Sequence, residues 1–186
     1  MKLYIKNMVC IRCKMMVKAE LGKLDIAYKS VELGEVQLIT PISEDTKQML
    51  SIALHKFGLE LMYDKKAIMI EKIINIVIEM VHYSDELPQM NFSTLLCEKM
   101  GRDYHKMSEI FSKTKGMTIE HFIIIHKVEK VKELIIYDEL SLSEIAYSLN
   151  YSSVSHLSNQ FKKITGYSPT YFKNLKLIKR KQIEDL

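Results

Sequence analysis

The most informative segment of the chain is residues 141–164, which read SLSEIAYSLNYSSVSHLSNQFKKI. A Ser at 141 followed three residues later by Glu144 forms a capping box, which predicts that a short helix begins here. The Asn150-Tyr151 pair predicts a tight turn, because Asn tolerates a positive φ angle. A second helix is expected from Ser153 to Ile164. The segment therefore reads as a short helix, a turn and a second helix.

The second helix has two unlike faces. Its predicted buried face holds Val154, Leu157, Phe161 and Ile164. The opposite face carries hydrogen-bonding groups, with two lysines near its end. This pattern is typical of a helix-turn-helix, whose second helix enters the DNA major groove, where such side chains reach base edges. We therefore expect double-stranded DNA as the partner, and the expected contact residues are Ser153, Ser155, His156, Asn159, Lys162 and Lys163.

The whole C-terminal half, from about residue 93, has helical periodicity and no strand signal. Helices are predicted at 93–100, 104–114, 118–136, 141–149, 153–164 and 168–175. The breaks between them contain Gly101, Gly116 and Gly166, residues that commonly end helices. The order of a short helix, a tight turn, a second helix and a glycine stop occurs twice, as a loose internal repeat.

Residues 141–173 resemble the signature of the AraC/XylS family of bacterial transcription regulators. The residues that carry this resemblance are Ser143-Glu144-Ile145-Ala146, Phe161-Lys162-Lys163, Gly166 and Ser168-Pro169. It extends back to about residue 93 through Met100-Gly101, Ile110-Phe111, Gly116-Met117-Thr118 and the stretch from Val128 to Ile136. The resemblance implies two helix-turn-helix units on one linker helix, entering adjacent major grooves on one face of DNA. For such a regulator we also expect RNA polymerase as a partner.

The chain departs from this family's pattern at three places. Asn150-Tyr151 stands where the family usually has Gly-Phe, and Glu109 and Asn159 stand where it often has Arg. An acidic side chain at 109 repels phosphate, and only the N4 amino group of cytosine offers it a good base partner. The first unit's expected DNA contacts are therefore other residues of the same helix, namely His105, Lys106 and Ser108.

The N-terminal part alternates short strands and helices. Strands are expected at Lys2–Lys6, Tyr28–Leu33, Val36–Ile39 and Leu59–Tyr63, and helices at Ile11–Leu24 and from Ser43 to about Phe57. This β-α-β-β-α-β order is the ferredoxin-like split arrangement. The predicted fold class is therefore α+β, with a ferredoxin-like domain at residues 1–65 and an all-α domain with two helix-turn-helix units at residues 85–176.

Two cysteines, Cys10 and Cys13, lie between the first strand and the first helix. Two thiols at this spacing can converge on one ion or form one disulfide. The segment Met8-Val9-Cys10-Ile11-Arg12-Cys13 resembles the metal loop of heavy-metal-associated domains, Gly-Met-Thr-Cys-x-x-Cys, although Asn7 replaces the Gly and Val9 the Thr. Three interpretations stay open: a site for Cu(I) or another soft metal, a redox dithiol, or structural cysteines. Cys97 is expected to be a buried free cysteine.

An apolar helix is predicted at residues 66–84, between the two domains. Its isoleucines and methionines surround it almost completely, so at residues 66–83 it must either join the domains or pair with its copy in a homodimer. We expect the domain boundary near residues 84–90. A basic tail is expected at residues 177–186, and the lysines between Lys173 and Lys181 would add affinity for phosphate.

Composition limits the possible functions. The net charge of +4 lies entirely in residues 87–186, which fits a C-terminal half that meets a polyanion. The start of the chain lacks the apolar core of a signal peptide and no apolar stretch is long enough to cross a bilayer, so we expect a cytoplasmic protein without a membrane partner. No GxSxG, P-loop, HExxH or paired-carboxylate pattern occurs, so an enzyme is not expected. The alternative to a regulator is a metal-trafficking or thiol-redox protein whose helical half is a protein-docking module.

Overall fold

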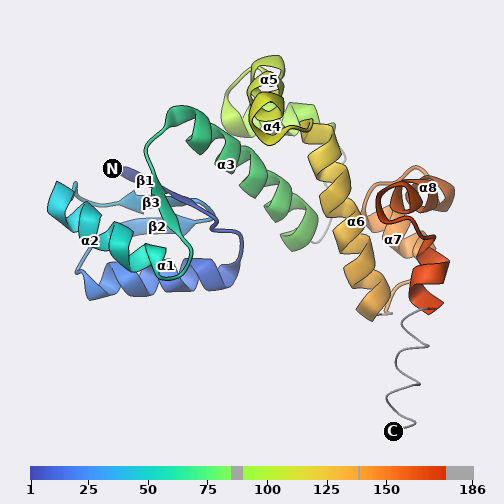
Figure 1. Ribbon diagram of the computed structural model, residues 1–186, viewed down its shortest axis with the longest axis horizontal. Helices are drawn as coiled ribbons and strands as arrows, with labels where there is room; N and C mark the ends of the chain where they lie inside the picture. Colours follow the sequence, from blue (N-terminus) through green and yellow to red (C-terminus); the bar gives the residue numbers. More distant parts are fainter. Residues whose placement is uncertain (85–89, 138, 175–186) are drawn as a thin grey trace, which may run out of the picture. The chain divides into compact units, whose positions relative to one another are not determined.

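A computed structural model describes residues 1–84, 90–137 and 139–174. The chain divides into two compact units, an N-terminal unit of residues Met1–Ile76 and a C-terminal unit that begins at Val77. Figure 1 shows the elements of each unit. Within the described residues, no helix is both long enough and apolar enough to span a membrane.

The N-terminal unit is a four-stranded antiparallel sheet with two helices on one face (Figure 1). The strands are β1 (Lys2–Lys6), β2 (Tyr28–Glu32), β3 (Glu35–Leu38) and β4 (Glu60–Met62), and the helices are α1 (Ile11–Lys23) and α2 (Glu44–His55). The spatial strand order is β2-β3-β1-β4, so β1 lies between two partners. The predicted β-α-β-β-α-β order is confirmed.

Alternation along the strands explains the core of this unit. Leu3 and Ile5 are buried while Lys2 and Lys6 are exposed, because successive side chains of a strand point to opposite faces. Ser43 caps α2 by accepting a hydrogen bond from the backbone N–H of Thr46, as the sequence predicts. The core between the sheet and the two helices is aliphatic, and includes Ile5, Val17, Leu21, Val36, Leu50 and Leu54.

Helix α3 (Lys65–Ile78) follows the last strand and is anchored to the sheet by polar contacts. The Glu71 carboxylate accepts a 2.8 Å hydrogen bond from the backbone N–H of Asn7. The ammonium group of Lys72 lies 2.9 Å from the carboxylate of Glu35 and 4.7 Å from the centroid of the Tyr4 ring. The buried side chain of Asn75 approaches the β2–β3 turn, where a Cβ on Gly34 would meet its Nδ2 atom at 2.1 Å.

The predicted helix at 66–84 changes form before it ends. Glu79–Tyr83 is a π-helical turn, η1, which packs against helix α6 (Ile119–Tyr137) of the C-terminal unit. The division between the compact units falls inside the predicted connecting helix, between Ile76 and Val77, and the domain boundary near residues 84–90 stays a prediction. The physical reason is that the first turns of α3 contact the sheet while η1 contacts α6. Residues 85–89, where the break is predicted, lie outside the described part of the chain.

The C-terminal unit is helical, as predicted. Besides α6 its helices are α4 (Phe92–Met100), α5 (Tyr104–Lys115), α7 (Leu142–Ser148) and α8 (Val154–Thr165), and residues 169–174 are also helical. Within the described residues, each predicted helix of this unit agrees with an observed one to within about two residues. Phe111 and Phe161 are fully buried. A large aromatic side chain thus lies at the centre of each helical half of this unit, Phe111 in the half formed by α4 and α5 and Phe161 in the half formed by α7 and α8. The predicted basic tail at 177–186 lies outside the described residues.

Candidate nucleic-acid interface

Helices α7 and α8 form the helix-turn-helix that the sequence predicts. The capping box is present, because Ser141 Oγ accepts from the Glu144 backbone N–H and the Glu144 carboxylate accepts from the Ser141 N–H. Asn150 takes the predicted left-handed conformation with φ of 50°. Tyr151 is buried after the turn, and its N–H donates to the Ala146 carbonyl oxygen at 2.8 Å. These contacts fix the connection between the two helices.

The outer face of α8 is exposed where the sequence predicts DNA contacts. Ser155, His156, Asn159, Lys162 and Lys163 are all exposed. Residues three and four apart lie on the same side of a helix, so these five side chains share one face. That face offers neutral hydrogen-bonding groups in its first two turns and two cations in its last turn.

Ser153 has a local structural role in α8. It is the N-cap, and its Oγ accepts a 3.1 Å hydrogen bond from the His156 backbone N–H. The His156 ring is held on one side, because its Nδ1 lies 3.0 Å from Ser152 Oγ and its edge meets the Tyr151 ring. A base contact from this imidazole would therefore use Nε2.

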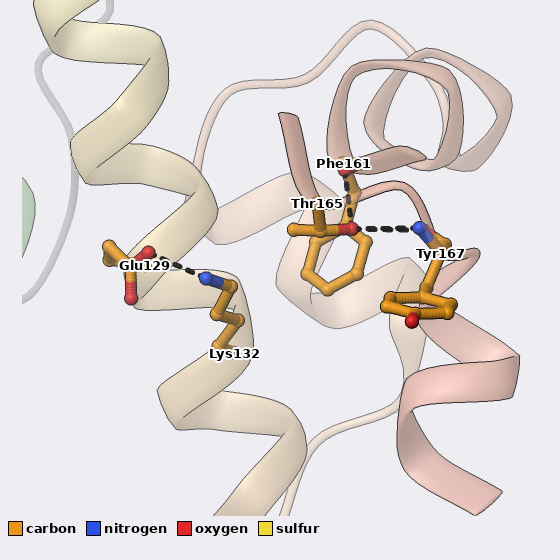
Figure 2. A network of polar contacts seen from close by, with 5 residues as sticks. All are labelled: Glu129, Lys132, Phe161, Thr165 and Tyr167. Atoms are coloured by element: carbon orange, nitrogen blue, oxygen red, sulfur yellow. Dashed lines mark hydrogen bonds and ion pairs between the residues drawn. The ribbon is translucent and has the colours of Figure 1, made fainter. Parts of the chain in front are cut away.

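Thr165 closes the C-terminal end of α8 (Figure 2). Its hydroxyl lies 2.9 Å from the carbonyl oxygen of Phe161 and accepts a 3.1 Å hydrogen bond from the Tyr167 backbone N–H. Gly166 ends the helix in the left-handed conformation with φ of 83°, which favours glycine. On α6, Figure 2 also shows the Glu129–Lys132 ion pair at 2.6 Å.

Helix α5 repeats α8 position by position. Adding 50 to each residue number of α5 gives the matching position of α8: the caps Asp103 and Ser153 each accept from the N–H three residues on, and Gly116 and Gly166 end the helices. The pattern of buried and exposed side chains from residue 104 to residue 111 is identical to that from 154 to 161. The loose internal repeat of the sequence is thus an accurate structural repeat.

The predicted contact residues of α5 are less uniform than those of α8. His105 and Lys106 are exposed, and Ser108 is half-buried. Glu109 is exposed on the same face and forms a 2.6 Å ion pair with Lys113. The contact from Lys113, and then its charge, hold the pKa of the Glu109 carboxyl below its usual value. This pair is not among the predicted contacts, although Glu followed by Lys four residues later on a helix is a recognised signal for an ion pair.

A cleft of about 480 Å³ lies between the two helical halves of the C-terminal unit. Lys127 of α6 lines it, together with Tyr151 and with His156 and Gln160 of α8. The Lys127 ammonium donates a 2.8 Å hydrogen bond to the Leu149 carbonyl oxygen, and burial lowers its pKa. No signal in the sequence predicted this residue, because the contact joins positions 22 residues apart.

The N-terminal cysteines lie together at the start of α1. Cys10 and Cys13 have their Sγ atoms 3.3 Å apart, so they are free thiols in contact. The Cys13 backbone N–H, and then the Cys13 thiol, hold the pKa of Cys10 below its usual value. This donor pair fits a soft ion such as Cu(I), and in the described chain no group of three or more His, Cys, Asp or Glu residues is placed to hold a metal. Cys97 is free but only half-buried, not fully buried as predicted.

Comparison with known proteins matches part of the C-terminal half to a domain model. Residues 96–174 match the family model of a helix-turn-helix domain. These residues form a helix-turn-helix domain. The domain starts within α4 and ends within the described residues. No curated protein sequence matches the chain.

Solved structures share the fold of this helix-turn-helix domain. The C-terminal domain of AraT, a response regulator from Geobacillus stearothermophilus, aligns with a TM-score of 0.51 and 20% identity over 60% of this chain and 88% of its own. The DNA-binding domain of AdpA, a global transcriptional factor solved with a target DNA, aligns with a TM-score of 0.52 and 19% identity over 61% of this chain and 96% of its own. The C-terminal domain of the response regulator yesN from Fusobacterium nucleatum is 28% identical over 55% of this chain and 95% of its own, with a TM-score of 0.47.

Proposed function

We propose that the protein is a sequence-specific DNA-binding transcription regulator that uses α5 and α8 as two recognition helices. The observation that carries this proposal is the exposed face of α8, on which Ser155, His156 and Asn159 precede Lys162 and Lys163. In a helix-turn-helix, the N-terminal residues of the second helix contact base edges. Cations farther along the helix bind phosphates whatever the sequence.

The repeat of α5 and α8 supports a bipartite site. Two helices with equivalent side-chain N-caps and the same exposed positions in their first eight residues are suited to two major-groove segments of one duplex. The first helix carries His105, Lys106 and Ser108 as its proposed contacts. The two helices carry equal formal charge, because α5 has three lysines and Glu109 whereas α8 has two lysines and no acidic residue.

The N-terminal unit is proposed to sense a soft metal or the thiol redox state through Cys10 and Cys13. Two thiols in contact at the start of a helix support this part of the proposal, because the lowered pKa of Cys10 favours the thiolate that binds metal or reacts with oxidants. Cu(I) would be held by the two sulfur atoms. Contact with RNA polymerase and homodimerisation through residues 66–83 complete the proposal, and analytical ultracentrifugation tests the second of these.

Selection of binding sites from random duplex DNA tests the proposed function. The full chain is incubated with the random pool in reductant, with and without Cu(I), and the bound duplexes are sequenced. The proposal predicts enrichment of one sequence with two separated conserved segments, and a change in recovery when Cu(I) is added. Unselective recovery would contradict DNA recognition, whereas selection that ignores Cu(I) and oxidation would contradict only the sensing role.

A further inference from the structure

Glu109 lies at the position of α5 that corresponds to a proposed base contact of α8. The 50-residue repeat matches it to Asn159 of α8, and both side chains are exposed at the same point between two buried residues of their helix. The buried neighbours are Met107 and Phe111 for Glu109, and Leu157 and Phe161 for Asn159. The backbone therefore presents a carboxylate in one helix where the other presents an amide.

The charge of Glu109 is compensated within its own helix. Lys113 Nζ lies 2.6 Å from Glu109 Oε1, and the two side chains are 74% and 51% exposed. His105, one turn earlier, also lowers the pKa of Glu109. A pair this exposed exchanges partners readily, because water competes for both of its members. The ammonium group can therefore move to a phosphate and leave the carboxylate oxygens facing the bases.

Base edges differ in what they offer to a carboxylate. Guanine presents two acceptors in the major groove and thymine presents one, so both repel an ionised carboxylate. Adenine presents a donor next to the N7 acceptor, whereas cytosine presents its N4 amino donor. A carboxylate at position 109 therefore favours cytosine over the other three bases.

We propose that Glu109 makes the first helix-turn-helix unit select a cytosine, with Lys113 moving from Glu109 to a DNA phosphate in the complex. This inference rests on the proposed function, because it assigns one base of the site that the regulator would read. The acidic residue, which in the sequence looks unfavourable for DNA binding, becomes a determinant of specificity for one half of the site.

Parallel binding-site selections with the full chain test the inference. The wild-type protein is compared with Glu109→Gln, in which an amide of the same length favours adenine through its N6 and N7 atoms. Wild type is expected to show one nearly invariant cytosine in one half of its site, and Glu109→Gln to replace it by adenine. On single duplexes, wild type should prefer cytosine to adenine at that position by about tenfold, and the variant should reverse the preference.

Two further variants separate specificity from structure. Glu98→Gln removes an exposed carboxylate from the neighbouring helix α4 and should leave the selected sequence unchanged. Lys113→Ala should weaken binding to all duplexes alike and retain the cytosine. A selected site whose bases are the same for wild type and Glu109→Gln would overturn the inference while leaving the proposed function intact. Failure of every variant and of wild type to select any sequence would overturn the proposed function itself.

Discussion

The side-chain ammonium of Lys127 donates a 2.8 Å hydrogen bond to the backbone carbonyl of Leu149, which ties α6 to the end of α7. Leu149 is the C-cap of α7, so its carbonyl belongs to the group of helix-terminal acceptors that need a partner from outside the helix. The same ammonium lies 5.2 Å from the centroid of the Tyr151 ring. One lysine thus holds the turn of the second helix-turn-helix against the linker helix.

Replacement of Lys127 by Met should therefore destabilise the C-terminal unit. The variant keeps the length of the side chain but removes the donor, and a lost hydrogen bond from a charged group costs about 1.5–3 kcal/mol. Urea unfolding followed by circular dichroism measures the change. Lys127→Arg retains a donor and should be closer to wild type, and Lys132→Met, on the same helix, should change stability little. Equal stability of Lys127→Met and wild type would contradict this role.

The pair formed by His82 and His126 predicts that the C-terminal unit loses stability in acid. His82 Nε2 lies 3.1 Å from His126 Nδ1, which joins η1 to α6. Burial lowers the pKa of both rings below the ordinary 6.5, with further lowering of His82 by Lys130 and of His126 by His82. Glu129 and Glu133 face the pair and act in the opposite direction. Both rings are therefore held in the neutral form in the folded protein.

The sign of this effect follows from linkage. At pH values between the lowered pKa values of the two folded rings and about 6.5, the unfolded chain binds more protons than the folded chain. The free energy of unfolding therefore falls as the pH falls through this range. Urea unfolding between about pH 5 and 8 measures the slope. His82→Gln should flatten it relative to wild type, and His121→Gln, at an exposed position of α6, should not. Parallel slopes for wild type and His82→Gln would show that the pair does not titrate in this range.

The lowered pKa of Cys10 predicts that this thiol reacts faster than Cys97. Both thiols are half-buried, so the larger thiolate fraction of Cys10 at neutral pH should decide the difference in their rates with iodoacetamide. Mass spectrometry of tryptic peptides over time measures both rates in one sample. Competition with a Cu(I) chelator should show one tight site in wild type and in Cys97→Ser, and none in Cys10→Ser. Cu(I) retained by Cys10→Ser would exclude the thiol pair as the metal site.

The local features of the fold were predictable from the sequence, and the contacts between distant residues were not. The capping box at Ser141, the cap at Ser43 and the positive φ of Asn150 each follow from residue types a few positions apart. The same is true of the proximity of Cys10 and Cys13. These features depend on short-range geometry, which periodicity and spacing encode directly.

The contacts of Lys127 and His82 are examples of long-range contacts that the sequence did not predict. They join residues 22 and 44 positions apart, and their formation depends on how whole helices pack. The π-helical form of Glu79–Tyr83 has no sequence signal that distinguishes it from the α-helix before it. The proposed role of Glu109 depends on its ion pair with Lys113 and on its match to Asn159, which the position-by-position repeat of α5 and α8 defines.

Two substitutions on α8 should separate base reading from phosphate binding. Asn159→Ala should relax sequence preference, with a loss of about 1–3 kcal/mol on the selected site and little loss on other duplexes. Lys162→Ala should weaken binding to all duplexes alike and reduce the dependence of log affinity on log salt by about one. Lys29→Ala, at an exposed position of the N-terminal unit, is the matched control and should change neither quantity. If Asn159→Ala and Lys162→Ala lost affinity for the selected and the other duplexes in the same proportion, the separate roles of base reading and phosphate binding would be contradicted.

The central claim is that the outer face of α8 reads the sequence of a DNA duplex. Fluorescence anisotropy at moderate salt, with the selected duplex and a scrambled duplex of the same composition, measures it most directly. The full chain should bind the selected duplex at least about 10³-fold more tightly than the scrambled one. Equal affinity for the two duplexes would contradict it.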